Sequence, residues 1–138
     1  MGPLPAYTCH RAQSPIRIDG RLDERAWVQA EPVSLLTADS GERTRQATMV
    51  RLLWDDAFLY VGFECQDEDI WGVTEERDQD IYEQEVVEVF VDAACCGTAY
   101  VEIEVSPLNA VLDLFMLCRD GRRRGLRDWD SAGLCTAV

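Results

Sequence analysis

Residues 82–92 read Tyr-Glu-Gln-Glu-Val-Val-Glu-Val-Phe-Val-Asp, and this stretch decides the fold. The aromatic residue Tyr82 is followed by carboxylates that alternate with valines, which is the period of a strand that buries one face. The acids are therefore expected on the exposed face. An aromatic ring beside fixed carboxylates is typical of a sugar-binding surface, because the ring covers the apolar C–H face of a pyranose while the carboxylates accept hydrogen bonds from its hydroxyls.

Strand periodicity continues on both sides of this stretch. Asp55 and Asp56 mark a turn between two alternating runs, and a long acidic connection over residues 66–83 leads to the central strand. Short strands separated by turns predict an all-β fold, an antiparallel β-sandwich of jelly-roll type. The predicted strands cover residues 47–54, 59–65, 85–92, 100–106 and 110–117, and a further one begins at residues 133–138.

The N-terminal part has weaker signals. Residues 16–18 read as a short strand that Asp19 and Gly20 end. One short helix is predicted over residues 23–30, with Asp23 as its N-cap and Pro32 beyond its end. Residues 37–46 and 119–127 are predicted to be loops, the second of them basic.

The composition restricts the class of partner. The chain has 138 residues, 47% of them hydrophobic and 28% charged, which fits one folded domain and not a disordered segment. The net charge is −13, and every basic side chain is an arginine. Such a balance argues against nucleic acid and anionic membranes as partners. It leaves neutral or cationic ligands, including Ca²⁺.

The cysteines and the N-terminus bear on the compartment. The six cysteines form no Cys-x-x-Cys pair, and His10 is the only histidine, so a zinc-thiolate site is not expected. Residues 1–8 lack the basic and apolar segments of a signal peptide. The sequence by itself therefore predicts a cytoplasmic protein with free thiols. A leader removed from a secreted precursor, with disulfides, is the alternative.

Three stretches, taken together and in this order, resemble the family 9 carbohydrate-binding modules. The first is Ile-Asp-Gly-Arg-Leu-Asp-Glu-Arg-Ala-Trp at residues 18–27, and the second is Leu-Trp-Asp-Asp-Ala-Phe-Leu-Tyr-Val-Gly-Phe at residues 53–63. The third is Glu-Val-Val-Glu-Val-Phe-Val-Asp at residues 85–92, followed by the alternating run from Tyr100 to Asn109.

The resemblance implies a β-sandwich that binds a mono- or oligosaccharide without cleaving it. Such modules are often appended to xylanases and other polysaccharide-active enzymes, and they are usually extracellular. By position, Tyr82 would form one aromatic wall of the sugar site and Glu88 would bond the hydroxyls. Glu104 and Ser106 take the places of a family arginine and asparagine, which puts the family's reducing-end specificity in question.

The family's second aromatic wall and closing strands fall beyond Val138. The resemblance therefore predicts a single module over residues 1–138 that lacks its C-terminal strands. Trp27 and Trp54 have apolar neighbours and are expected in the core, whereas Trp71 and Trp129 are candidates for secondary stacking.

Each assignment has an alternative. Tyr82 is equally consistent with a ring that covers the core, and Glu88 with Glu104 could form a plain solvated face. Relatives carry structural calcium, and acids of residues 67–80 offer suitable oxygens without EF-hand spacing. These acids are Asp67, Glu68, Asp69, Glu75, Glu76, Asp78 and Asp80.

Two other functions compete with sugar binding. One is an acidic module of the same fold that binds a protein or calcium. The other is a glycoside hydrolase with Glu88 and Glu104 as its carboxylate pair. The hydrolase is disfavoured because nothing in the sequence predicts that either acid stays protonated.

Overall fold

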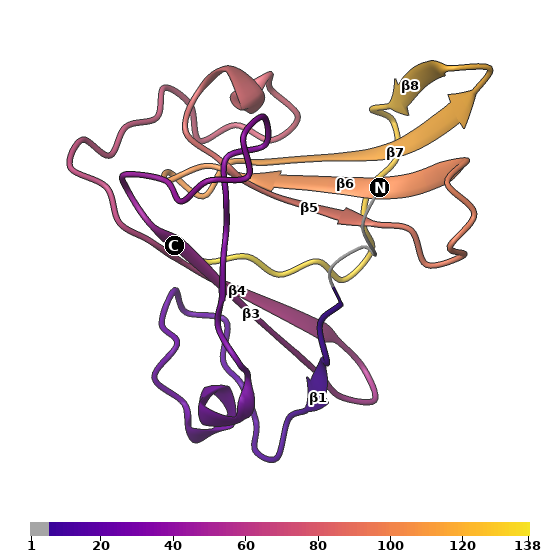
Figure 1. Cartoon of the computed structure of the whole chain (residues 1–138). Helices are drawn as coiled ribbons and strands as arrows, with labels where there is room; N and C mark the ends of the chain where they lie inside the picture. The colour runs from indigo at the N-terminus through magenta and orange to yellow at the C-terminus, as the bar shows by residue number, and fades with distance from the viewer. Residues whose placement is uncertain (1–5) are drawn as a thin grey trace. The chain divides into compact units, whose positions relative to one another are not determined.

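The computed structural model describes residues 6–138 and is all-β (Figure 1). It contains two four-stranded sheets, and the chain divides into two compact units. The first unit ends at Glu68 and the second is Asp69–Val138. Within residues 6–138, no helix is both long and apolar enough to cross a membrane.

The sheet of the first unit is built on the hairpin of β3 (Thr48–Trp54) and β4 (Leu59–Cys65). The short strands β1 (His10–Arg11) and β2 (Val33–Ser34) also pair with β3. Asp55 closes the hairpin as predicted, since its carboxylate accepts hydrogen bonds from the backbone N–H groups of Ala57 and Phe58, each at 2.8 Å. The same carboxylate accepts a hydrogen bond from the phenol O–H of Tyr60 at 2.7 Å.

Trp27 is the centre of the first unit's core, which confirms its predicted role. It is buried with Ala26, Ala30 and Leu53. Its ring and Leu22 lie over Gly62 of β4, where a Cβ atom would come within 2.7 Å of Leu22 Cδ2. The absence of a side chain at Gly62 is therefore what lets Leu22 and Trp27 pack against the strand.

Three expectations for the first unit are wrong. The α-helix predicted over residues 23–30 is replaced by a 3-10 turn, η1 (Arg25–Gln29), which has no side-chain cap. The carboxylate of Glu24 is engaged elsewhere, because it accepts the N–H of Arg17 at 2.9 Å and the indole N–H of Trp27 at 3.1 Å. The strand predicted over residues 16–18 does not form, because the N–H of Arg17 is bonded to Glu24 and cannot pair with another strand. Trp54, expected in the core, is instead 41% exposed. The guanidinium of Arg11 lies 5.5 Å from its ring centroid.

The second unit is an antiparallel sheet whose strands follow one another in chain order (Figure 1). The strands predicted over residues 85–92, 100–106 and 110–117 are confirmed, with bounds that shift by a few residues. Asp92 ends the first strand and accepts the N–H of Gly97 at 2.7 Å, so residues 93–98 turn the chain as predicted. The strands are β5 (Val87–Val91), β6 (Ala99–Val105), β7 (Val111–Arg119) and β8 (Arg122–Leu126).

The strand β8 lies where the sequence predicted a basic loop. Asp120 and Gly121 both have positive φ, 51° and 74°, and they join β7 to β8 as a two-residue turn. This Asp-Gly pair suits the tight hairpin turn that matches the twist of antiparallel strands. Residues 133–138, expected to begin a strand, contain no strand. The all-β architecture with two sheets is confirmed, and the packing of these sheets as a sandwich stays a prediction.

The register divides the second sheet into two faces. Glu88 lies opposite Glu104 and Phe90 lies opposite Glu102, so these four side chains share one face. The valines of β5 point to the other face. Part of the first face is covered by the short turn η2 (Ile81–Glu83), whose Ile81 is fully buried with Ala110, Leu112 and Leu114.

Candidate functional site

Tyr82 is an exposed residue of η2. Its side chain is 49% exposed, while the adjacent Ile81 fills the core beneath the turn. Partial burial and the negative charge and hydrogen bond of Asp80 raise the pKa of the Tyr82 phenol. The ring therefore presents a surface to solvent from a position that its neighbour fixes.

The loop that carries Tyr82 is tied to the sheet at several points. The backbone N–H of Asp78 donates to Val111 of β7 at 2.9 Å. Just beyond β8, the guanidinium of Arg127 donates to the carbonyl oxygen of Asp78 at 3.0 Å and to the carboxylate of Asp80. Since Asp80 also bonds the Tyr82 phenol, Arg127 and Asp80 together set the position of the ring.

Glu88 and Glu104 are brought together as a directly opposed pair on β5 and β6. Glu88 is exposed, whereas Glu104 is only 1% exposed and its Oε2 atom has no hydrogen-bond partner within residues 6–138. Burial, then the charges of Glu88 and Glu102, raises the pKa of Glu104 to about 7. Burial and the charge of Glu102 also raise the pKa of Glu88. The expectation that nothing holds either acid protonated is therefore wrong for Glu104.

Ser106 lies in the turn between β6 and β7 and its side chain is buried. Its hydroxyl oxygen accepts the backbone N–H groups of Leu108 at 3.3 Å and Ala110 at 3.2 Å. Asn109, between them, has a φ of 59°. The hydroxyl of Ser106 thus stabilises a tight turn and is directed into the protein.

Several residues of the same face were not identified from the sequence. Phe90 is 58% exposed, and its ring packs edge-on against Tyr100 with the centroids 5.6 Å apart. Glu102 lies opposite Phe90. The alternation of residues 82–92 already places Phe90 on the side of Glu88, so this signal was present. Arg127 had no comparable signal, because only the unpredicted hairpin brings it to Asp80.

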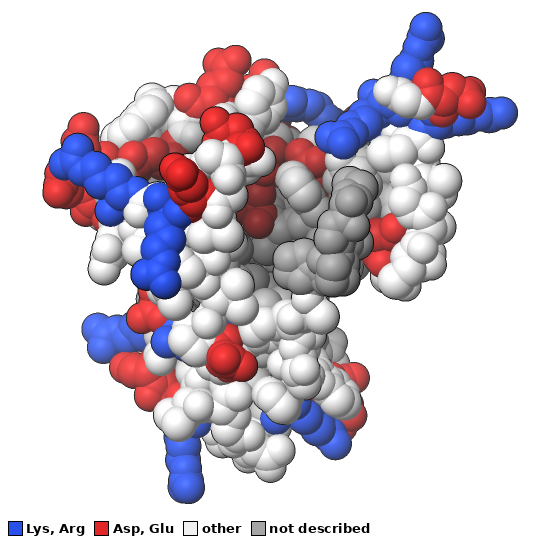
Figure 2. Space-filling view, in the orientation of Figure 1, with Lys and Arg blue, Asp and Glu red and all other residues white. Residues whose placement is uncertain are grey.

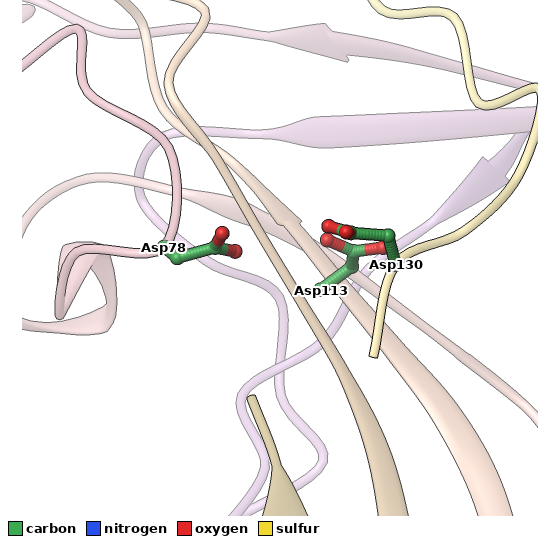
Figure 3. Close-up of side chains that lie close together, drawn as sticks. All are labelled: Asp78, Asp113 and Asp130. Carbon is green, nitrogen blue, oxygen red and sulfur yellow. The ribbon is translucent and has the colours of Figure 1, made fainter. Parts of the chain in front are cut away.

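A second carboxylate group lies in the same unit and is shown in Figure 3. Asp78, Asp113 and Asp130 each place an oxygen within 4.8 Å of the others. They come from the loop before η2, from β7 and from the C-terminal segment. Of the acids that the sequence offered for calcium, Asp78 alone belongs to this group.

Arg77 already engages these three carboxylates. Its guanidinium donates to Asp113 and, at 3.1 Å, to Asp130, and it lies 3.7 Å from Asp78. The buried Asp113 also accepts the N–H of Ser131 at 2.5 Å. Carboxylate oxygens suit Ca²⁺, but the guanidinium binds the same oxygens. With Arg77 in this place the group does not fit a calcium ion.

The two tryptophans proposed for secondary stacking differ. Trp71 is 45% exposed, and its backbone N–H donates to the carboxylate of Glu85 at 3.1 Å. Trp129 is half-buried, with its ring centroid 5.8 Å from that of Phe115. All six cysteines are free.

Comparison with known proteins agrees with the resemblance. Residues 18–111 match the family described as carbohydrate family 9 binding domain-like. The chain is also 36% identical over 85 residues to endo-1,4-beta-xylanase A of Thermoanaerobacterium saccharolyticum. That similarity covers 62% of this chain and 7% of the xylanase, so the chain spans a small part of its relative's length. No solved structure matches. The chain belongs to the carbohydrate family 9 binding domain-like family.

Proposed function

We propose that this chain is a non-catalytic module that binds a mono- or oligosaccharide and acts with polysaccharide-degrading enzymes. The observation that carries the proposal is the exposed ring of Tyr82, which Asp80 and Arg127 hold in the unit that also presents the Glu88–Glu104 pair. The family and the xylanase relative support the same class of ligand and an appended catalytic domain.

The exposed and the buried residues of the site have different roles in the proposed function. The Tyr82 ring stacks on the apolar face of a sugar, and the exposed Glu88 accepts hydrogen bonds from hydroxyls. Glu104 lies opposite Glu88 on the neighbouring strand, and in its protonated form it removes the repulsion between the two carboxylates. Ser106 contributes by holding the turn that follows β6.

Calorimetric titration with xylo- and cello-oligosaccharides tests the site. Tyr82→Ala should weaken binding by about tenfold or more, since stacked aromatic residues dominate such interfaces. Tyr82→Phe keeps the ring but loses the hydrogen bond to Asp80, so it should bind more weakly than wild type and more tightly than Tyr82→Ala. Phe58→Ala removes a similarly exposed ring from the first unit and serves as the control. Lack of saccharide binding by the folded protein, or undiminished binding by Tyr82→Ala, would reject the proposal.

A calcium- or protein-binding module is the second candidate, favoured by the acidic composition. A thermal-shift screen separates the two functions. Sugar binding predicts a higher melting temperature with the oligosaccharide that titrates at Tyr82. A rise with CaCl₂ alone would favour the second candidate.

The raised pKa of Glu104 beside a second carboxylate is a feature of glycoside hydrolases. However, the Glu104 side chain is almost fully buried, which keeps it from the oxygen of a glycosidic bond. We therefore expect no turnover of nitrophenyl glycosides by the chain. Turnover that disappears in Glu88→Gln would establish the hydrolase instead.

A further inference from the structure

The tip of the β7–β8 hairpin concentrates positive charge on an acidic protein. Residues 119–124 read Arg-Asp-Gly-Arg-Arg-Arg, whereas the chain as a whole carries −13. Figure 2 shows these blue side chains projecting from the hairpin. The only ion pair recorded for these arginines within residues 6–138 joins Arg119 to its neighbour Asp120 at 3.7 Å, and both side chains are highly exposed. Such a pair is weak, so the four guanidinium groups are available to a partner.

One of these arginines faces the candidate sugar site. Arg123 lies opposite Cys118, and Met116 of the same strand lies opposite Tyr100, so the alternation puts Arg123 on the face of Phe90 and Tyr100. Burial raises the pKa of the Tyr100 phenol, and the positive charge of Arg123 opposes that rise. The guanidinium is therefore within electrostatic reach of the aromatic pair.

On this face, Met116 of β7 lies between Tyr100 of β6 and Gly125 of β8. Gly125, the next residue of β8 on this face, has no side chain, and a Cβ atom there would lie 3.1 Å from the sulfur of Met116. From β5 to β8 the sheet spans three strand spacings, about 14 Å. Phe90, Tyr100 and Arg123 thus mark a track across the sheet that is long enough for more than one sugar unit.

The charges along this track differ at its two ends. Glu88 and Glu102 stand beside Phe90, where they accept hydroxyl hydrogen bonds and repel a carboxylate. The arginines stand at the other end, and the planar guanidinium matches a carboxylate with two parallel hydrogen bonds. The hydroxyls of a neutral sugar can accept hydrogen bonds from this cluster, but a carboxylate forms stronger, charge-assisted ones. A sugar that carries an acid group fits both ends.

We propose that Phe90, Tyr100 and the hairpin arginines form a second subsite, and that its ligand is an oligosaccharide bearing uronic acid groups. The proposal rests on the sugar-binding function proposed above. The neutral units lie over Tyr82 and Glu88, with Phe90 extending the stacking surface. The uronate carboxylate pairs with Arg123, while Arg122 and Arg124, which the alternation places on the other face of β8, add positive charge at this end of the sheet.

Three matched ligands test this subsite by calorimetry in low salt. They are a xylo-oligosaccharide, the same oligosaccharide with one glucuronic acid branch, and the branched form with its carboxyl group reduced to an alcohol. The acidic form should bind about fivefold more tightly than the reduced form. The preference should shrink at 300 mM NaCl, because exposed charges are screened.

Variants assign the preference to the track. Replacement of Arg122, Arg123 and Arg124 together by glutamine should abolish the preference for the acidic ligand and leave the affinity for the neutral one within about twofold. Phe90→Ala should weaken binding of all three ligands. Arg45→Gln, at a side chain of the first unit that is 88% exposed, should change nothing.

Other outcomes are equally decisive. Equal affinity for the acidic and reduced forms, or a preference that survives in the triple variant, would overturn the subsite while Tyr82-dependent neutral binding still upheld the proposed function. Equal binding of polyglutamate or of a nucleic acid would show general anion attraction and would also overturn it. Loss of all saccharide binding would instead reject the proposed function, and the subsite with it.

Discussion

At the scale of single residues, the buried Glu104 has the largest effect on how the free energy of unfolding depends on pH. Its folded-state pKa of about 7 exceeds the ordinary 4.5, so the native state keeps a proton that the unfolded chain has lost. The free energy of unfolding should therefore fall as pH rises from about 4.5 to about 7. By linkage this contribution is at most about 3 kcal/mol.

Glu104→Gln isolates this effect, because glutamine keeps a polar group of the same shape without the titration. Other acids also titrate, since the pKa of Glu88 is raised and that of Asp92 is lowered by the backbone N–H of Gly97. The measurement is therefore the difference between wild type and variant in urea unfolding at pH 5 and pH 8. The variant should gain relative stability at pH 8. Parallel pH profiles would contradict the buried acid.

Ser106→Ala distinguishes a turn role from a sugar contact. Its hydroxyl accepts two backbone N–H groups in a buried turn, so the variant should lose about 1 to 2 kcal/mol of unfolding free energy. The sugar affinity of the folded variant should not change. Ser34→Ala, at an exposed position, is the control and should cost less than 0.5 kcal/mol. A loss of affinity in folded Ser106→Ala would restore a direct contact with the ligand.

Residue positions were predictable where periodicity alone decides them. The alternation of residues 82–92 put Glu88 and the valines on opposite faces, as the register confirms. It did not predict the burial of Glu104, because burial depends on what covers a face and the covering turn η2 belongs to a long loop. Trp54 was misjudged for a related reason: β3 is apolar on both sides, so its pattern does not reveal which side is covered.

At the scale of elements, Arg77 links the loop before η2 to β7 and to the C-terminal segment. Arg77→Gln should destabilise the protein by about 3 kcal/mol, since it leaves the buried Asp113 without its charged partner. It should also free the carboxylates of Asp78, Asp113 and Asp130 for a cation.

Thermal melting with and without CaCl₂ measures this competition. The rise in melting temperature on adding calcium should be larger for Arg77→Gln than for wild type, because the guanidinium no longer engages the oxygens. Arg127→Gln, which removes the other arginine of this loop, provides the comparison and should not gain a calcium response. An equal calcium response in wild type and Arg77→Gln would mean that the ion binds elsewhere.

The elements that were predicted wrongly from the sequence have structures determined by long-range strand pairing or by single side chains. The predicted basic loop contains Asp120-Gly121, a strong hairpin signal, but the arginines after it lack the apolar alternation that identifies a strand. The predicted α-helix at residues 23–30 had a suitable cap in Asp23. The structure instead uses Glu24 to bind the indole of Trp27, and the segment tightens into a 3-10 turn.

At the scale of the whole molecule, the net charge of −13 opposes compaction through self-repulsion. Raising NaCl from 20 to 500 mM at pH 8 should therefore raise the melting temperature, since salt screens exposed charges beyond a few ångströms. Near pH 4.5 many carboxylates are protonated, and the same salt step should have a smaller effect. A salt response of equal size at both pH values would argue against repulsion as its cause.

The fold class was predictable because strand alternation and turn residues agree along most of the chain. The single domain over residues 1–138 stays a prediction, and the division into two compact units at Glu68 was not anticipated from the sequence. That boundary lies in a polar, acidic stretch without a change of periodicity, so it gave no local signal. The family was recognisable because its motifs occur in order, although none of them is decisive alone.

The strand β8 is also an edge strand of its sheet, and one side of its backbone has no neighbouring strand among those described. An unprotected edge strand can pair with a strand of a second molecule, which leads to aggregation. Three successive arginines oppose this by mutual repulsion between copies. The same side chains thus serve colloidal stability, and replacing them with valine would produce a protein that precipitates before its ligand preference could be read.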